Sequence, residues 1–266
     1  MYILKLIIIN TMKLVILAGG LGTRFAEETH SKPKPMIKIL GKPIIVRIME
    51  HYSRYKIKKF IICGGYKWTV IKKYFLSKSK NSKIIYKRKK IVGHNFTLKN
   101  NGWNIQLINT GKHTMTGGRI SKIKNFLEDC DEDFCLTYGD GISDVNISKL
   151  IKFHNKQKLL ATVLAVRPPA RFGSLKIKNK KVTSFEEKNQ NSESLINGGF
   201  FILSKKIFKF IKKSSTIFEQ YPLKKIASLG QLGSYYHAGF WMPMDTLRDK
   251  KIIEKYIKEN KNKLKI

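Results

Sequence analysis

Short, continuously apolar segments alternate with helical patterns along much of the chain, and this alternation limits the possible folds more than any other feature. The apolar segments are 14–18 (LVILA), 59–63 (KFIIC), 133–138 (DFCLTY) and 159–166 (LLATVLAV). Helical periodicity is found near 43–56, 116–128 and 146–157. Strands that are apolar on both faces are typical of parallel sheets covered by helices on each side. The sequence therefore predicts an α/β fold with a Rossmann-like, mixed but mainly parallel sheet flanked by helices.

The domain organisation is predicted to be simple, because no Pro/Gly/Ser-rich linker and no internal repeat divides the chain. Beyond about residue 167 we expect shorter strands (SLKI, KVTSF, INGGFFIL and GSYYHA) and helices near 204–212, 219–229 and 245–260. A single domain is expected over 12–266. The Lys-rich segment of about 77–113 lacks a clear helical pattern and is interpreted as an insertion. Met12 begins a clean strand, so residues 1–11 are interpreted as an N-terminal extension that a later start codon would omit.

The charge of the chain is strongly positive, with 53 basic and 18 acidic residues and a formal net charge of +35. Such a charge could indicate a basic nucleic-acid-binding protein, since clustered cations gain affinity by releasing counterions. However, only eight of the basic residues are arginines, and the lysines are spread through nearly every segment. We therefore expect no nucleic-acid partner, although this class remains the alternative of a different kind.

The N-terminal segment and the cysteines indicate the expected location. Lys5, Asn10 and Lys13 interrupt the first apolar stretch, which is shorter than the roughly 18 to 20 residues that a membrane span needs, and no cleavage site follows. The three cysteines show no zinc-like spacing, and Cys63 ends an apolar segment that is typical of a core. We expect a cytoplasmic protein without a membrane partner.

A glycine-rich loop follows the first strand, in the stretch LAGGLGTRFAEETHSKPKPM (17–36). Glycines allow backbone N–H groups to approach phosphate oxygens closely. The loop has no GK[ST], so it is not a P-loop, and Phe25 stands where a dinucleotide fingerprint needs its last glycine. Arg24 offers a planar fork for phosphate, and Lys34, between two prolines, is a point charge on a stiffened backbone. The pattern predicts a phosphate site of a third kind.

The same loop closely resembles the motif GGxGTRxxxxTxxxPKxM of the sugar-1-phosphate nucleotidylyltransferases, which join a nucleoside triphosphate to a sugar phosphate and release pyrophosphate. Further segments resemble the branch of this family that forms CDP-glucose: ICGGYK (62–67), MTGGRI (115–120), TYGDG (137–141), RFGSL (171–175), FEEK (185–188), INGGFF (196–201) and GFWMPMDTLRDK (239–250). The resemblance spans about residues 12–255, with the motifs in the same order. It implies the nucleotide-diphospho-sugar transferase type of fold.

The resemblance also implies roles for individual residues. It assigns nucleotide binding to Leu17, Ala18, Gly19, Gly20, Leu21, Gly22, Thr23, Arg24, Lys34, Thr114, Gly117, Gly118 and Arg119, with Arg24 and Lys34 as the catalytic cations. It assigns sugar-phosphate binding to Gly173, Glu187, Lys188, Asn197 and Gly198. A proline commonly follows Glu-Lys in this family, whereas Asn189 stands at that position here.

Two aspartates are the expected magnesium ligands. Magnesium takes one or two protein carboxylates and leaves its other positions to phosphates and water. Asp140 follows a strand in the turn YGDG, and Asp245 precedes the last helix. Each has an alternative explanation, because Asp140 could stabilise a turn and Asp245 could cap the helix. The six histidines match no ligand or triad spacing, and we interpret them as structural or surface residues.

The expected activity, implied by the resemblance, is transfer of the cytidylyl group of CTP to glucose 1-phosphate with the aid of Mg²⁺. UTP, dTTP or another sugar phosphate remains an alternative within the same chemistry. The resemblance also implies a homo-oligomer, namely a hexamer.

Overall fold

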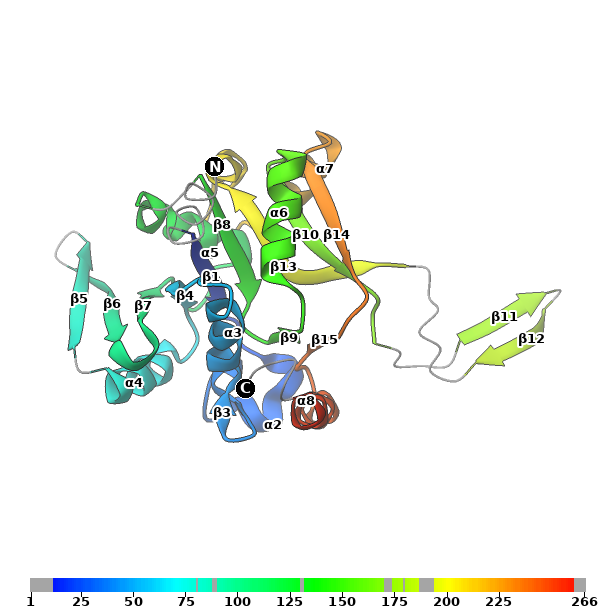
Figure 1. Ribbon diagram of the computed structural model, residues 1–266, viewed down its shortest axis with the longest axis horizontal. Helices are drawn as coiled ribbons and strands as arrows, with labels where there is room; N and C mark the ends of the chain where they lie inside the picture. Colours follow the sequence, from blue (N-terminus) through cyan, green and yellow to red (C-terminus); the bar gives the residue numbers. More distant parts are fainter. Residues whose placement is uncertain are drawn as a thin grey trace.

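The computed structural model describes residues 12–79, 81–87, 90–129, 132–169, 174–178, 180–186 and 194–260. A nine-stranded sheet with the order β14-β10-β13-β8-β1-β4-β7-β6-β5 forms its centre (Figure 1). Its strands are β1 (Lys13–Ala18), β4 (Lys59–Gly64), β5 (Asn81–Lys87), β6 (Lys90–Leu98), β7 (Trp103–Asn109), β8 (Asp133–Tyr138), β10 (Ala161–Val166), β13 (Ile196–Ser204) and β14 (Leu232–His237).

The sheet is mixed, with a parallel centre. β1 pairs in parallel with both β4 and β8, and β4 pairs in parallel with β7. β13 lies antiparallel between β8 and β10, and β5 and β6 continue the other edge as an antiparallel hairpin. The expected mixed sheet flanked by helices is confirmed.

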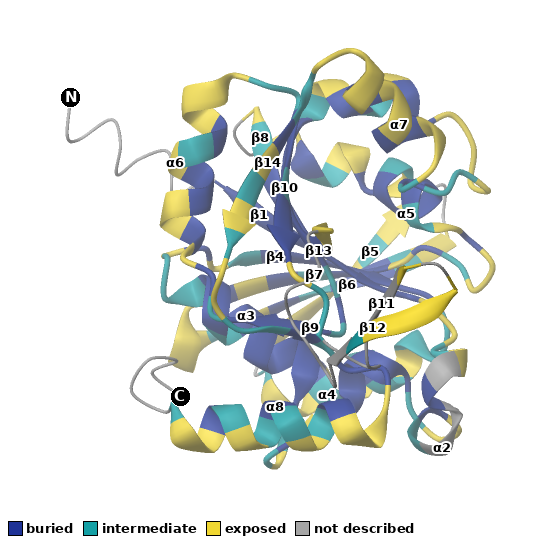
Figure 2. Cartoon of the chain, turned by 90° about the vertical axis from the view of Figure 1, so that its right-hand side faces the viewer, coloured by how far each residue is buried: buried dark blue, intermediate teal, exposed yellow. Residues whose placement is uncertain are grey.

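Helices cover both faces of this sheet. The α-helices are α2 (Ala26–Thr29), α3 (Ile44–Ser53), α4 (Trp68–Lys78), α5 (Thr116–Lys122), α6 (Ile147–Gln157), α7 (Tyr221–Ser228) and α8 (Leu247–Glu259). Buried side chains of α3, α4, α6 and α8 pack on one face, and those of α5 and α7 pack on the other. In Figure 2 the central strands of the sheet are buried and the outer sides of the helices are exposed.

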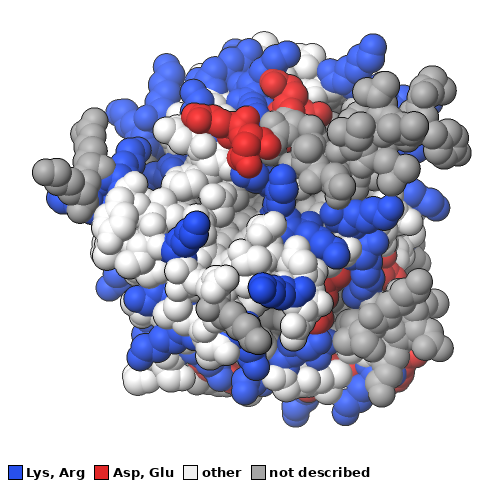
Figure 3. Space-filling model, turned by 60° about the vertical axis from the view of Figure 1, so that its left-hand side comes forward, with Lys and Arg blue, Asp and Glu red and all other residues white. Residues whose placement is uncertain are grey.

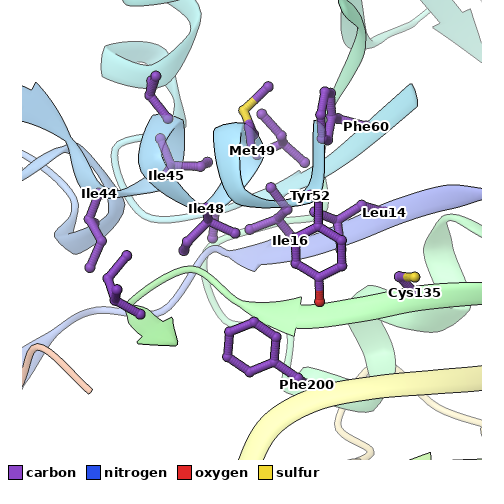
Figure 4. Packing of buried hydrophobic residues seen from close by; sticks show 14 of the residues in the cluster. Leu14, Ile16, Ile44, Ile45, Ile48, Met49, Tyr52, Phe60, Cys135 and Phe200 are labelled. Atoms are coloured by element: carbon purple, nitrogen blue, oxygen red, sulfur yellow. The ribbon is translucent and has the colours of Figure 1, made fainter. Parts of the chain in front are cut away.

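The core follows from the two-sided apolar strands. Leu14 and Ile16 of β1 point to the α3 face, whereas Val15 and Leu17 point to the α5 face. On the α3 face, Tyr52 lies over Phe200 of β13 with parallel rings (Figure 4). Fully burying each such side chain contributes about 1.5–3 kcal/mol. This packing fixes the strand ends from which the site loops emerge.

Several elements differ from the sequence expectation. The segment 77–113, interpreted as an insertion, contributes the end of α4 and the strands β5, β6 and β7 to the main sheet. In β7 exposed Asn104 alternates with buried Trp103 and Ile105. The polar residues interrupt the apolar ones, so the sequence pattern did not identify this segment as a strand of the main sheet. The helix expected over 116–128 ends at Lys122 and continues as a 3₁₀ turn, and 204–212 forms the 3₁₀ helix Lys205–Phe210.

Small two-stranded elements complete the fold. β9 (Gly141–Ser143) pairs with β15 (Trp241–Pro243), and β2 (Lys38–Ile39) pairs with β3 (Lys42–Pro43). The hairpin of β11 (Ser174–Lys178) and β12 (Lys181–Glu186) extends away from the central sheet (Figure 1). None of the helices in the described ranges is long and apolar enough to cross a membrane.

Candidate active site

The candidate site lies where the carboxyl ends of the parallel strands β1, β4 and β8 meet. Loops at this edge of an open α/β sheet form the usual ligand site of such folds. The glycine loop leaves β1 there, and Gly139–Asp140 leaves β8. Because β13 is antiparallel to β8, its first residues, 196–199, begin at the same edge.

Hydrogen bonds within the glycine loop close it into a turn, and part of its backbone stays accessible. Gly22 has φ +69°, a left-handed conformation that favours glycine. The Thr29 hydroxyl donates to the carbonyls of Phe25 (2.9 Å) and Gly22 (3.2 Å), which closes the turn. Gly20 is exposed, and a Cβ there would meet no atom within 4 Å. The loop can therefore bring its backbone close to a ligand.

The other predicted loop residues have varied surroundings. Leu17 and Ala18 are the buried end of β1, and the Leu17 carbonyl accepts from the Gly139 N–H at 3.0 Å. Leu21 and Thr23 are exposed. Arg24 lies in the 3₁₀ turn Thr23–Phe25, and its side chain is outside the described part of the structure.

Lys34 lies at the centre of the site. It begins the 3₁₀ turn Lys34–Met36, and its side chain is only 8% exposed. Its Nζ lies 2.6 Å from Asp140 Oδ2 and 2.6 Å from Asp245 Oδ1. The structure thus brings together a predicted catalytic cation and both predicted metal ligands.

A short ribbon explains why the two aspartates converge. Gly141, directly after Asp140, pairs with Pro243 in the β9–β15 ribbon, and the Met244 N–H donates to the Asp140 carbonyl at 2.9 Å. Pairing after one aspartate and before the other holds both carboxylates at the same ammonium group.

The alternative role of Asp245 as a helix cap is wrong. The cap of α8 is Thr246, whose hydroxyl accepts from the Asp249 N–H at 3.1 Å. Asp249 Oδ2 in turn accepts from the Asp245 N–H at 3.0 Å. These bonds hold the Asp245 backbone, while its carboxylate contacts Lys34.

Arg119 holds the site loops together from inside the protein. The residue is 4% exposed, and its guanidinium donates to the carbonyls of Gly19 (2.8 Å) and Gly111 (2.9 Å) and to the Thr110 hydroxyl (2.6 Å). A Cβ on Gly19 would lie 2.1 Å from this side chain, so the approach requires glycine. Burial lowers the pKa of Arg119. The predicted contact of Arg119 with a nucleotide stays a prediction.

The neighbouring predicted base-binding residues are also buried. The Thr114 hydroxyl donates to the Thr110 carbonyl at 2.6 Å. A Cβ on Gly117 or Gly118 would collide with Thr216 or Ser214, respectively, so these glycines allow the loop 213–220 to cross the start of α5. Their described contacts lie within the protein.

On the sugar side, the structure describes two of the five predicted residues. Gly173, Glu187 and Lys188 lie outside the described residues. Asn197 is exposed, and its Oδ1 accepts from the Gly199 N–H at 2.8 Å. The Gly198 carbonyl accepts from Trp241 Nε1 at 2.6 Å, which ties the start of β13 to the β9–β15 ribbon.

One residue beside the site, Glu219, was missed by the sequence analysis. Glu219, in the loop before α7, accepts hydrogen bonds from Tyr138 and Thr116. No local motif marks Glu219, because only the fold brings it to Tyr138.

A second cluster was also missed. His237 Nε2 lies 2.8 Å from Asp144 Oδ1, and the Tyr256 hydroxyl donates to Asp144 Oδ2 at 2.6 Å. This cluster joins α8 to the end of the β9–β15 ribbon. The interpretation of the histidines as structural or surface residues stays a prediction. Cys63, expected in the core, is fully buried, and burial raises its pKa to about 12.

One face of the molecule is rich in cations. Figure 3 shows Lys and Arg side chains dispersed over the visible face. Together, the sheet edge, the glycine loop and the Lys34–Asp140–Asp245 cluster form the candidate site.

Comparison with known proteins identifies the family. Residues 13–241 match the nucleotidyl transferase family, and the chain belongs to it. The chain is 47% identical over 247 residues to the glucose-1-phosphate cytidylyltransferase of Salmonella typhimurium, covering 91% of this chain and 95% of that protein. It is 32% identical to the D-glycero-alpha-D-manno-heptose 1-phosphate guanylyltransferase of Campylobacter jejuni, covering 79% and 84% of the two chains.

A solved structure shares the fold. HddC from Yersinia pseudotuberculosis superposes with a TM-score of 0.67 at 24% identity, covering 92% of this chain and 99% of that one. At this identity the likeness concerns the fold alone.

Proposed function

We propose that the protein transfers the cytidylyl group of CTP to α-D-glucose 1-phosphate and forms CDP-glucose and pyrophosphate. The observation that carries this proposal is the 47% identity, over nearly the whole chain, to a glucose-1-phosphate cytidylyltransferase. The sugar-phosphate oxygen attacks the α-phosphorus, and the bond from that phosphorus to the pyrophosphate oxygen breaks.

The site residues suit this reaction. Charge builds on the phosphates in the transition state, so catalysis depends on alignment and on fixed positive charge. The open glycine loop offers backbone N–H groups. Lys34 supplies a buried ammonium group within reach of the same edge. We propose that Arg24 binds the leaving pyrophosphate and that Lys34 bridges the α-phosphate and the sugar phosphate.

We propose Mg²⁺ as the cofactor, held by Asp140 and Asp245. Their carboxylates are hard oxygen donors that converge on the Lys34 ammonium group. The side chain of Asp140 is 28% exposed and so is open to an incoming ligand. Two carboxylates fit an ion that keeps its other positions for phosphates and water. Mg²⁺ would supply additional positive charge at the phosphates. No group of three or more potential metal ligands occurs among the described His, Cys, Asp and Glu residues.

The choice of base is the first property to test. With glucose 1-phosphate and Mg²⁺, we expect CTP to give the highest kcat/KM among the four ribonucleoside triphosphates and dTTP. A pyrophosphate-release assay measures these values. If UTP or dTTP equalled CTP, the cytidylyl assignment would fail while the reaction class would stand.

Assembly and location form a separate proposal. We propose a cytoplasmic homo-oligomer, namely a hexamer. Size-exclusion chromatography with light scattering should give six times the mass of the 30.8 kDa chain. A monomer at micromolar concentration would contradict this.

A further inference from the structure

Glu219 connects the nucleotide side of the site with the sugar side. One carboxylate oxygen accepts from the Thr116 hydroxyl at 2.6 Å, at the first residue of α5. The other accepts from the Tyr138 hydroxyl, two residues before Asp140. The Phe218 N–H donates to the Thr116 oxygen at 2.9 Å, so the Thr116 proton is directed to Glu219.

The direction of the hydrogen bonds can be derived from their chemistry. An ionised carboxylate only accepts, so Tyr138 must give Glu219 its single hydroxyl proton. Burial, and then the neighbouring Glu219 carboxylate, raise the pKa of Tyr138, which keeps the hydroxyl protonated. The Tyr138 oxygen can therefore only accept from its next neighbour.

That neighbour is the Asn197 amide. Its Nδ2 lies 3.4 Å from the Tyr138 oxygen, and its Oδ1 accepts from the Gly199 N–H at 2.8 Å. Both contacts select the same orientation of the amide. In the reverse orientation the amide oxygen would face the Tyr138 oxygen, acceptor against acceptor, and the amide nitrogen would face the Gly199 N–H, donor against donor. Among the described residues no partner is found for the second N–H of Nδ2, so this N–H can donate to a ligand.

Gly199 keeps the tyrosine in place. It has φ +77°, and a Cβ on it would lie 2.4 Å from the Tyr138 ring. The ring therefore packs directly on the backbone of the loop that carries Asn197.

We infer that Glu219 is a positioning residue that, through Tyr138, fixes the Asn197 amide so that it presents an N–H donor to a hydroxyl oxygen of the sugar phosphate. This inference rests on the proposed function, in which Asn197 faces glucose 1-phosphate. The Thr116 contact holds the same carboxylate from the nucleotide side.

The test separates the hydrogen bond of Glu219 with Tyr138 from its hydrogen bond with Thr116. Tyr138→Phe removes the proton donor that faces Glu219 and the acceptor that faces Asn197, whereas Thr116→Val removes only the other of these two hydrogen bonds. We expect Tyr138→Phe and Glu219→Ala to raise KM for glucose 1-phosphate about tenfold, the effect of about one hydrogen bond, with KM for CTP and kcat changed less than about threefold. Thr116→Val, which leaves the Tyr138 contact in place, should raise KM for glucose 1-phosphate less than Tyr138→Phe does. Glu128→Gln, at an exposed glutamate, is the matched control.

A double-mutant cycle tests whether Glu219 acts through Asn197. If it does, Glu219→Ala should lower kcat/KM for glucose 1-phosphate little further in an Asn197→Ala background. Additive losses, or equal losses for both substrates, would overturn the inference. Glu219→Gln and Tyr138→Phe decide the matter if Glu219→Ala does not fold, as judged by circular dichroism. If the wild-type enzyme forms no CDP-glucose, the proposed function fails, and the same variants are compared by calorimetric titration with glucose 1-phosphate.

Discussion

Asp140→Ala and Asp245→Ala are each expected to lower kcat by at least about a hundredfold, the loss seen when one preorganised electrostatic group is removed. Both carboxylates lie 2.6 Å from Lys34 Nζ, so each substitution removes a proposed Mg²⁺ ligand and also releases the lysine from one of its partners. The pyrophosphate-release assay at saturating CTP and glucose 1-phosphate measures kcat, and a Mg²⁺ titration measures the metal requirement of each variant.

The two aspartates should act as a unit. Because they share one lysine and one proposed ion, the double variant should lose little more activity than either single variant. Thr246, not Asp245, caps α8, so Asp245→Ala should keep the helix. Glu128→Ala serves as the control for removing a negative charge. A folded Asp245→Ala enzyme with near-normal kcat and unchanged Mg²⁺ dependence would exclude Asp245 from metal binding.

The sequence alone predicts those strands whose apolar pattern can be recognised within the segment itself. The strands around 14–18, 59–63 and 133–138 are two-sided and apolar, and each lies in the sheet. The hairpin β5–β6 could not be predicted, because lysines and asparagines toward the exposed edge of the sheet hide its period, and in β7 polar residues interrupt the apolar ones. The packing of β7 against β4 is decided by residues far away in the chain.

The sequence could predict which residues belong to the site, but not how they are arranged in space. Motifs marked Lys34, Asp140 and Asp245, yet the ribbon that brings the aspartates together joins Gly141 to Pro243, and no local pattern encodes that pairing. Glu219 carries no motif at all. An arginine next to two glycines suits contact with a bound nucleotide and contact with a group of backbone carbonyls equally well, and the sequence alone does not distinguish the two roles.

Arg119→Met is therefore expected to act mainly on stability and on the shape of the glycine loop. Every hydrogen bond found for the Arg119 guanidinium within the described residues ends on a carbonyl or on the Thr110 hydroxyl. Some of these acceptors keep other donors, since the Gly19 carbonyl also accepts from the Tyr66 N–H and the Gly64 carbonyl from Thr110. Others, such as the Gly111 carbonyl, would lose the donor that Arg119 provides. We expect the free energy of unfolding to fall by about 3 kcal/mol, which lowers Tm by about 6–12 °C in a chain of this size.

The measurement must distinguish whether Arg119 holds the site loops together or binds the nucleotide directly. Thermal unfolding gives Tm, and kinetics at a temperature where the variant is folded give KM for CTP. Arg119→Lys should recover little stability, because one ammonium group cannot span carbonyls on three separate segments as a guanidinium does. Arg248→Met, at an exposed arginine in α8, should leave Tm nearly unchanged. If Arg119→Met kept the wild-type Tm but raised KM for CTP strongly, Arg119 would be a direct nucleotide ligand. A lowered Tm together with a lower kcat at saturating CTP would identify Arg119 as the residue that shapes the loop around the nucleotide.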